Sequence, residues 1–114
     1  MKFLIVDDNE IFRKYLREFI AGNNDECTEL DDGIDVNKIY KSFMPDWVLL
    51  DIVMKSVNGF EAAVNLKKEF PAAHIAMVSN YSDDKFQSKA RKVGAAVLVS
   101  KENLYELIEV IKHN

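Results

Sequence analysis

The chain has 114 residues, long enough for one domain with one core, and its 15 basic and 19 acidic side chains give a formal net charge of −4. An acidic balance of this kind argues against a domain that binds nucleic acid by neutralising phosphates. The composition, 48% apolar and 30% charged, excludes a disordered or fibrous chain, and the single cysteine excludes an internal disulfide.

Short apolar runs recur along the chain and predict five β-strands. The first run is only four residues long, too short for a signal peptide or a membrane-spanning helix, so we expect a cytoplasmic protein. Three of the runs are apolar almost throughout, as in strands that are covered on both faces. In chain order, the predicted strands are Phe3–Val6, Glu26–Leu30, Trp47–Leu50, Ile75–Val78 and Ala95–Val99.

Between these runs, apolar residues recur at the spacing of helices that pack one face against a core. We expect Asn9, Asp35 and Ser82 to cap helix N-termini, and Gly22 and Gly94 to lie where helices end. The predicted core-facing stripes are, in chain order, Ile11, Tyr15 and Phe19; Val36, Ile39, Tyr40 and Phe43; Ala63, Leu66 and Phe70; Phe86, Ala90 and Val93; Leu104, Leu107, Ile108 and Ile111.

Strand and helix alternate five times, and this (βα)5 order predicts an α/β fold with a doubly wound parallel five-stranded sheet and helices on both faces. Residues 1–114 form one domain in this interpretation, because no Pro-, Gly- or Ser-rich linker divides them. In open parallel sheets, functional sites lie beyond the carboxyl ends of the strands. The residues at those ends are therefore the first candidates for a site.

Polar side chains follow four of the five predicted strands. Asp7 and Asp8 follow the first strand, Asp51 the third, Ser79 the fourth and Lys101 the fifth. The acidic pair alone could simply cap the first helix, but parallel strands bring all of these residues to one rim. Three carboxylates raise one another's pKa, and a hard divalent cation such as Mg²⁺ would relieve this. One carboxylate could then act as a nucleophile in phosphoryl transfer, with the metal, the ammonium and the hydroxyl neutralising charge.

With these residues at these spacings, the sequence resembles the receiver domain of bacterial two-component response regulators, and in particular the chemotaxis regulator, over essentially all 114 residues. The acidic pair, Asp51, Ser79 and Lys101 match the family's motifs in order. Met54 and Gly59 match the loop that follows the family's phosphoacceptor. The resemblance implies a flavodoxin-like strand order, 2-1-3-4-5.

The resemblance also implies which residues carry the chemistry. Asp51 would accept a phosphoryl group from a sensor histidine kinase or a phosphotransfer protein, in a Mg²⁺-dependent reaction. Asp8 would bind the metal directly and Asp7 mainly through water, and Asp51 and the main-chain carbonyl of Val53 would be further ligands. At most, such a domain phosphorylates and dephosphorylates itself, so we expect a signalling domain and not an enzyme.

Two further residues would respond to the phosphoryl group. Lys101 would pair with Asp51 and then with the phosphoryl oxygens, and Ser79 would turn toward the phosphate. The surface of the fourth helix, fifth strand and fifth helix, with Lys85, Lys89 and Tyr105 as candidates, would then switch and control a partner. Residues 1–114 leave no room for an effector domain, so that partner would be a downstream protein or the rest of a longer regulator. The domain could also form a homodimer. We do not expect it to bind nucleic acid or a membrane directly.

Several positions depart from the family's pattern. Leu98 replaces an aromatic residue, which leaves the output step open, and Glu102 replaces a proline, which implies a trans or a strained loop. Lys55, also in place of a proline, is either a phosphate contact or a solvated loop residue. Val53 and Tyr81 are bulky residues that could hinder an attacking water, and we expect slow self-dephosphorylation.

Two other functions stay open from the sequence. A degenerate receiver would serve as an interaction module without phosphoryl transfer; the intact site residues argue against it, while Leu98 and Glu102 leave the output half undecided. An aspartate-nucleophile phosphatase of the haloacid-dehalogenase kind should carry a second aspartate two residues after the nucleophile. This chain has Val53 at that position.

Overall fold

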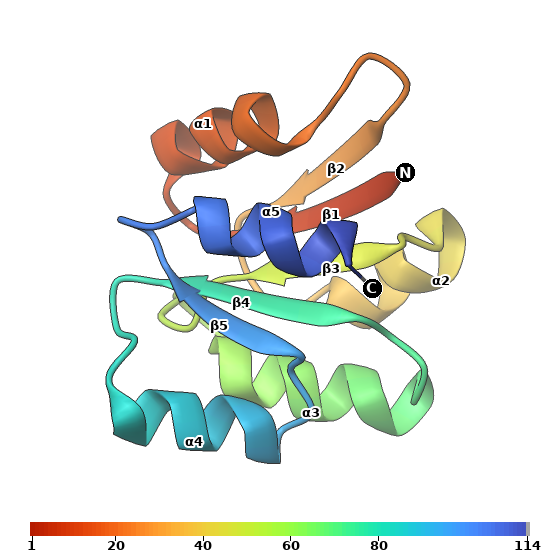
Figure 1. Cartoon of the computed structure of the whole chain (residues 1–114). Helices are drawn as coiled ribbons and strands as arrows, with labels where there is room; N and C mark the ends of the chain where they lie inside the picture. The colour runs from red at the N-terminus through yellow and green to blue at the C-terminus, as the bar shows by residue number, and fades with distance from the viewer. Residues whose placement is uncertain (114) are drawn as a thin grey trace.

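A computed structural model describes residues 1–113 of the chain, in which strands and helices alternate (Figure 1). The strands are β1 (Lys2–Val6), β2 (Glu26–Leu30), β3 (Trp47–Leu50), β4 (Ile75–Ser79) and β5 (Val97–Ser100). The helices are α1 (Glu10–Ile20), α2 (Val36–Phe43), α3 (Gly59–Glu69), α4 (Asp84–Lys92) and α5 (Tyr105–Lys112). No helix within these residues has the length and apolar content that crossing a bilayer requires.

The strands form one parallel sheet in the order β2-β1-β3-β4-β5. The predicted fold class and strand order are confirmed. The register places Val6 beside Leu50, Leu50 beside Met77 and Ser79 beside Ser100, so β4 and β5 extend two residues beyond the ends of β1 and β3. The fifth strand begins at Val97, two residues later than predicted. The carboxyl ends of the strands form one rim, where Asp7, Asp51 and Lys101 follow β1, β3 and β5 and Ser79 ends β4.

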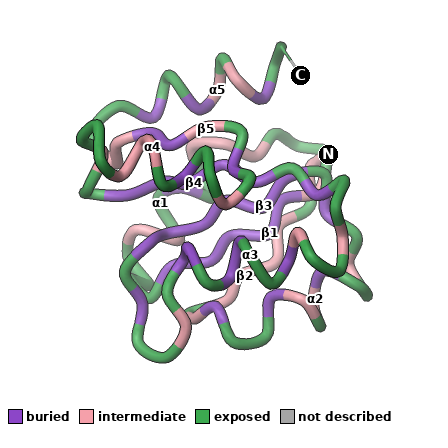
Figure 2. Tube along the Cα trace, turned by 90° about the horizontal axis from the view of Figure 1, so that it is seen from below, coloured by how far each residue is buried: buried purple, intermediate pink, exposed green. Residues whose placement is uncertain are grey.

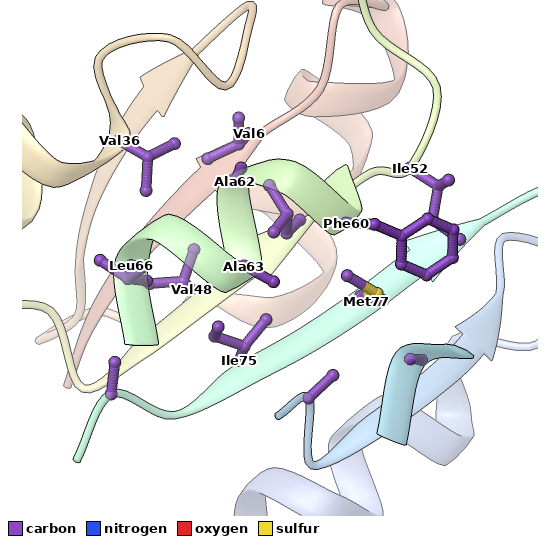
Figure 3. Close-up of a cluster of buried hydrophobic side chains, with 14 of the residues drawn as sticks. Val6, Val36, Val48, Ile52, Phe60, Ala62, Ala63, Leu66, Ile75 and Met77 are labelled. Atoms are coloured by element: carbon purple, nitrogen blue, oxygen red, sulfur yellow. The ribbon is translucent and has the colours of Figure 1, made fainter. Parts of the chain in front are cut away.

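Helices cover both faces of the sheet (Figure 1). On one face, α1 and α5 contribute Leu16 and Leu107 to a buried cluster. On the other face, α2, α3 and α4 contribute Val36, Leu66 and Ala90 to a second cluster, part of which Figure 3 shows. Figure 2 shows burial concentrated along the strands between these two layers. Strands buried on both faces explain why the central runs of the sequence are apolar almost throughout.

The buried face of α1 differs from the predicted stripe. Ile11 is 83% exposed and Tyr15 is 53% exposed, and only Phe19 of the predicted three packs against the core. The helix instead buries Leu16 and partly buries Phe12. At about 100° per residue, the core-facing side is centred between Phe12 and Leu16, so Ile11 and Tyr15 lie at its edge or beyond and only Phe19 reaches the core.

The helix ends follow the sequence signals with one exception. Asn9 accepts a hydrogen bond from an amide in the first turn of α1 (3.0 Å), and Gly94, at a φ of +94°, follows the end of α4. The N-cap of α4 is Asp83, which accepts an amide hydrogen bond at 3.1 Å, and not the predicted Ser82. Asp35 occupies the N-cap position of α2 without a side-chain hydrogen bond.

Candidate functional site

Three aspartates lie together at the carboxyl rim of the sheet. Asp7 and Asp8 follow β1 and Asp51 follows β3, and one carboxylate oxygen from each lies within 4.8 Å of the others. Asp7 and Asp51 are buried, at 2% and 7% exposure, whereas Asp8 is exposed. Carboxylate oxygens at this spacing are the ligands that hard divalent cations prefer, so this acidic group could hold a metal ion.

Lys101 brings a positive charge to the two buried carboxylates. Its Nζ lies 2.8 Å from Oδ2 of Asp7 and 3.5 Å from Oδ2 of Asp51. We expected a pairing with Asp51, and the shorter of the two contacts is the one to Asp7. The same nitrogen lies 4.4 Å from the centroid of the Phe12 ring, a cation–π contact that helps to hold it at the rim. One ammonium beside three carboxylates leaves the site negatively charged.

Asp7 and Asp51 differ in how many of their carboxylate oxygens already have a hydrogen-bond or ion-pair partner in the protein. Asp7 accepts the Lys101 contact on Oδ2 and a 2.8 Å hydrogen bond from the amide of Asn9 on Oδ1. Asp51 accepts a 2.8 Å hydrogen bond from the amide of Ile52 on Oδ1. Protein contacts therefore occupy both oxygens of Asp7, while one oxygen of Asp51 has only the longer contact.

The ionisation of Asp51 reflects this crowded environment. Burial raises the pKa of Asp51 to about 6, and the Asp7 carboxylate adds to the shift. The Lys101 ammonium acts in the opposite direction but does not cancel these effects. At neutral pH the carboxyl is still mostly ionised, so it can act as a nucleophile, and a cation beside it would lower the cost of its charge.

The acidic rim opens into a cavity of about 230 Å³. Ser79 lies in its wall, almost fully buried, and its Oγ accepts a 3.1 Å hydrogen bond from the amide of Tyr81. The volume equals that of several water molecules at about 30 Å³ each, enough for a hydrated ion. The cavity is lined by Asp8, Asn9, Asp51, Val53, Ser79, Asn80, Tyr81 and Lys101.

The loop between β3 and α3 turns back closely over Asp51. The amide of Gly59 donates a 2.7 Å hydrogen bond to the carbonyl of Ile52, and a Cβ at Gly59 would overlap the carbonyl oxygen of Asp51. Asp32, from the loop after β2, accepts a 3.0 Å hydrogen bond from the amide of Ser56 and so fixes the far side of this loop. The sequence analysis missed Asp32, although its position two residues after the end of β2 is a signal that could have found it.

Comparison with known proteins identifies the family. The family model of the response regulator receiver domain matches residues 3–112. This chain belongs to the response regulator receiver domain family. It is 35% identical over 98 residues to the chemotaxis protein CheY of Halobacterium salinarum, covering 86% of this chain and 82% of that protein. The receiver domain is a signalling domain of two-component systems, as the sequence resemblance implied.

Relatives with other overall lengths share the same domain. The transcriptional regulatory protein DegU of Brevibacillus brevis is 28% identical over 115 residues, which cover 98% of this chain and 49% of that protein. The crystal structure of a LuxR-family two-component response regulator from Aurantimonas sp. SI85-9A1 superposes with a TM-score of 0.87 at 26% identity, covering 96% of this chain and 83% of that one. This receiver thus spans about half the length of one such regulator.

The structure shows the surroundings of three positions that depart from the receiver pattern. Leu98 is buried in the core, and its carbonyl accepts a 2.9 Å hydrogen bond from the side chain of Gln87 in α4. The peptide bond between Lys101 and Glu102 is trans, which decides between the two loop forms that the sequence left open. Lys55 is exposed and lies outside the cavity lining, as a solvated loop residue does.

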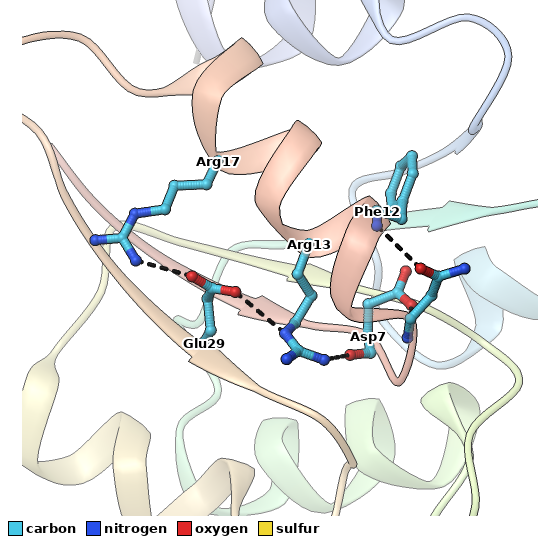
Figure 4. Close-up of polar contacts among 6 residues, drawn as sticks. Asp7, Phe12, Arg13, Arg17 and Glu29 are labelled. Atoms are coloured by element: carbon cyan, nitrogen blue, oxygen red, sulfur yellow. Dashed lines mark hydrogen bonds and ion pairs between the residues drawn. The ribbon is translucent and has the colours of Figure 1, made fainter.

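Arg13 is a second residue at the rim that the sequence analysis missed. From α1, its Nη1 donates a 2.7 Å hydrogen bond to the carbonyl oxygen of Asp7, and its Nε donates a 3.1 Å hydrogen bond to Glu29 of β2 (Figure 4). No sequence motif signals such a contact, because its acceptor is a main-chain oxygen.

Proposed function

We propose that this receiver accepts a phosphoryl group on Asp51 in a Mg²⁺-dependent reaction, from a sensor histidine kinase or a phosphotransfer protein. The observation that carries the proposal is the meeting of three carboxylates and the Lys101 ammonium at one open rim. Phosphoryl transfer to an aspartate needs a bound cation and a deprotonated carboxylate. The acidic rim could hold the cation, and Asp51 supplies the carboxylate.

The donor set fits Mg²⁺. Asp8, Asp51 and the main-chain carbonyl of Val53 would bind the ion, and Asp7 would act mainly through water, because the protein already occupies both of its oxygens. Magnesium binds through one or two carboxylates together with waters and phosphate oxygens. When bound, the ion would supply charge neutralisation for the transferred group.

In the transfer step, a carboxylate oxygen of Asp51 attacks the phosphorus of the donor's phosphohistidine. The new O–P bond forms an acyl phosphate, the P–N bond breaks, and its electron pair returns to the donor's imidazole. Lys101, with Nζ 3.5 Å from Oδ2 of Asp51, would move its contact to a phosphoryl oxygen. The hydroxyl of Ser79 would donate a hydrogen bond to another.

A chain of aromatic contacts supports a switch that reaches α4. The Ser79 hydroxyl holds the amide of Tyr81, whose ring stacks on Phe86 of α4 with 5.5 Å between centroids. Phe86 also stacks on Phe60 of α3 at 6.1 Å. When the Ser79 hydroxyl turns toward the phosphate, it releases Tyr81, and the stacked rings pass the change to α4. This route works without the aromatic residue that Leu98 replaces.

The switched surface of α4, β5 and α5 would control a downstream protein or an effector domain. Lys85, Lys89 and Tyr105 are exposed on it and available for contacts. Because the chain spans 49% of its DegU relative, a separate effector domain is a reasonable partner. Four further points stay predictions: homodimerisation, a cytoplasmic location, the absence of direct binding to nucleic acid or membrane, and the extent of the receiver over residues 1–114.

The phosphoryl group would be long-lived. Val53 and Tyr81 line the cavity that an attacking water must enter, and both remain half exposed at its mouth, at 56% and 54%. Hydrolysis of the phosphorylated protein should take much longer than seconds. Mass spectrometry measures it as the loss of the added phosphoryl mass over time. Complete hydrolysis within seconds would contradict this part of the proposal.

Acetyl phosphate labelling tests the proposed function. The wild-type protein should gain the mass of one phosphoryl group in the presence of Mg²⁺ and none in EDTA, while Asp51→Asn should gain none. The variant Asp31→Asn, which removes an exposed carboxylate from the loop after β2, is the matched control and should label like wild type. Equal labelling of Asp51→Asn would contradict the assignment of the acceptor.

Two other outcomes would select the alternatives. A wild-type protein that gains no mass with Mg²⁺ would favour a degenerate receiver acting as an interaction module. Steady turnover of a small phosphomonoester would favour the aspartate-nucleophile phosphatase.

A further inference from the structure

The guanidinium group of Arg13 connects three elements beside the acidic rim. It reaches from α1 to the carbonyl oxygen of Asp7 at the end of β1 (2.7 Å) and to Oε1 of Glu29 in β2 (3.1 Å), as Figure 4 shows. The Arg13 side chain is 15% exposed and that of Glu29 is 24% exposed. Both partners are therefore partly shielded from water, where charge-assisted hydrogen bonds are stronger.

Glu29 fixes the direction of this guanidinium. Its Oε1 binds Arg13 and its Oε2 binds Nη1 of Arg17 at 2.8 Å. Burial alone would raise the pKa of Glu29, but the hydrogen bonds from Arg17 and Arg13 outweigh it, so this pKa is lowered and the carboxylate stays charged. A charged carboxylate held on both oxygens is a rigid support for the planar arginine fork.

The Arg13 contact completes the hydrogen bonds of the residue that precedes Asp8. The amide of Asp7 donates to the carbonyl of Leu30 at 3.0 Å, and its carboxylate accepts from the protein on both oxygens. The carbonyl that Arg13 holds belongs to the peptide unit joining Asp7 to Asp8. Fixing this unit sets the direction in which the exposed Asp8 side chain leaves the main chain.

We infer that Arg13 is a positioning residue for the divalent-cation site, acting through the Asp7 carbonyl and supported by Glu29. It orients the peptide that presents Asp8 through its 2.7 Å hydrogen bond to the Asp7 carbonyl. The inference rests on the proposed function, because it requires that Asp8 bind a metal ion. Outer-shell partners of metal ligands typically change metal affinity by about 10- to 100-fold.

Calorimetric titration with MgCl₂ tests this role. In Arg13→Gln, the Kd for Mg²⁺ should rise about tenfold, the lower end of the outer-shell range. Arg17→Gln is the matched control, because it removes a 2.8 Å contact to Glu29 and none to Asp7; its Kd should rise much less than that of Arg13→Gln. Arg13→Lys keeps the charge but not the fork, so it should bind Mg²⁺ more weakly than wild type.

A phosphorylation assay separates positioning from a general structural role. The Mg²⁺ concentration that gives half the maximal rate with acetyl phosphate should rise in Arg13→Gln, while the rate at saturating Mg²⁺ should match wild type. Thermal unfolding of the metal-free variants checks that each is folded. If Arg13→Gln is unfolded, the comparison is made with Arg13→Lys.

Two results would overturn the inference. Either Mg²⁺ binds equally to wild type and the Arg13 variants, or Arg17→Gln loses as much affinity as Arg13→Gln. A wild-type protein that binds no Mg²⁺ would instead overturn the proposed function, so the two failures are distinguishable.

Discussion

The buried carboxyl of Asp51 lowers the stability of the metal-free folded protein once the pH is high enough to ionise it. Its pKa is about 6 in the folded protein, against an ordinary value of 3.8. Below pH 4 the carboxyl is protonated in both folded and unfolded states and has little effect on stability. Between pH 4 and 6 the unfolded state loses the proton first, which destabilises the folded protein, and above pH 6 this effect is complete.

Asp51→Asn should therefore stabilise the metal-free protein at pH 8 by on the order of 1–3 kcal/mol and have little effect near pH 4. Urea unfolding in EDTA at pH 4, 6 and 8 measures this. Asp31→Asn, at an exposed position, should show no such trend. A variant that is no more stable than wild type at pH 8 would be inconsistent with the burial and charge of Asp51.

Gly59 has a steric role at the site. A Cβ there would overlap the carbonyl of Asp51, whereas one at Gly22 would meet only the flexible carboxylate of Asp25, at 3.4 Å. We expect Gly59→Ala to lower the free energy of unfolding by about 1–3 kcal/mol or more, as overpacking does. Gly22→Ala, measured in the same urea titration, should be tolerated. If the two variants are equally stable, the loop does not approach Asp51 as closely as described.

Among the elements, the start of α4 offers a direct test of its cap. Asp83→Ala removes the acceptor of the 3.1 Å hydrogen bond from the amide of Phe86 and should cost about 1 kcal/mol of unfolding free energy. The neighbouring Ser82→Ala should cost much less, because the carbonyl of Ser82, and not its hydroxyl, accepts the bond from Gln87. Thermal unfolding of the pair measures the difference; a larger loss in Ser82→Ala would restore the cap predicted from the sequence.

The aromatic stack between the site and α4 predicts a separation of phosphorylation from output. Phe86→Ala removes the ring between Tyr81 and Phe60. The variant should still accept a phosphoryl group, but the amide NMR shifts of α4 on phosphorylation should be much smaller than in wild type. Tyr105→Ala, which removes an exposed ring of α5, is the control and should leave the α4 shifts intact. Full-size α4 shifts in Phe86→Ala would contradict this route.

At the scale of the whole molecule, the rim was the most predictable feature. Asp8, Asp51, Ser79 and Lys101 each stand within two residues of an apolar run, and the carboxyl ends of parallel strands bring such positions to one edge of the sheet. The alternation of strands and helices was equally visible. The strand order was not, because several orders satisfy the same alternation; it came from the family resemblance.

What the sequence could not predict depends on side-chain direction. The shorter contact of Lys101, to Asp7, follows from the path of a long flexible side chain. The role of Arg13 follows from a bond to a main-chain oxygen, which leaves no residue pattern. The exposed Ile11 and Tyr15 were placed in the core because spacing alone does not show which side of an apolar helix meets the sheet.

Reduction with sodium borohydride tests the acceptor site most directly, because it converts an aspartyl phosphate to homoserine and leaves a free carboxylate unchanged. After treatment with acetyl phosphate and Mg²⁺, peptide mass spectrometry should find homoserine at position 51 alone, and at no position when EDTA replaces Mg²⁺. Homoserine at position 7 or 8, or none at all with Mg²⁺ present, would contradict a Mg²⁺-dependent phosphoacceptor at Asp51.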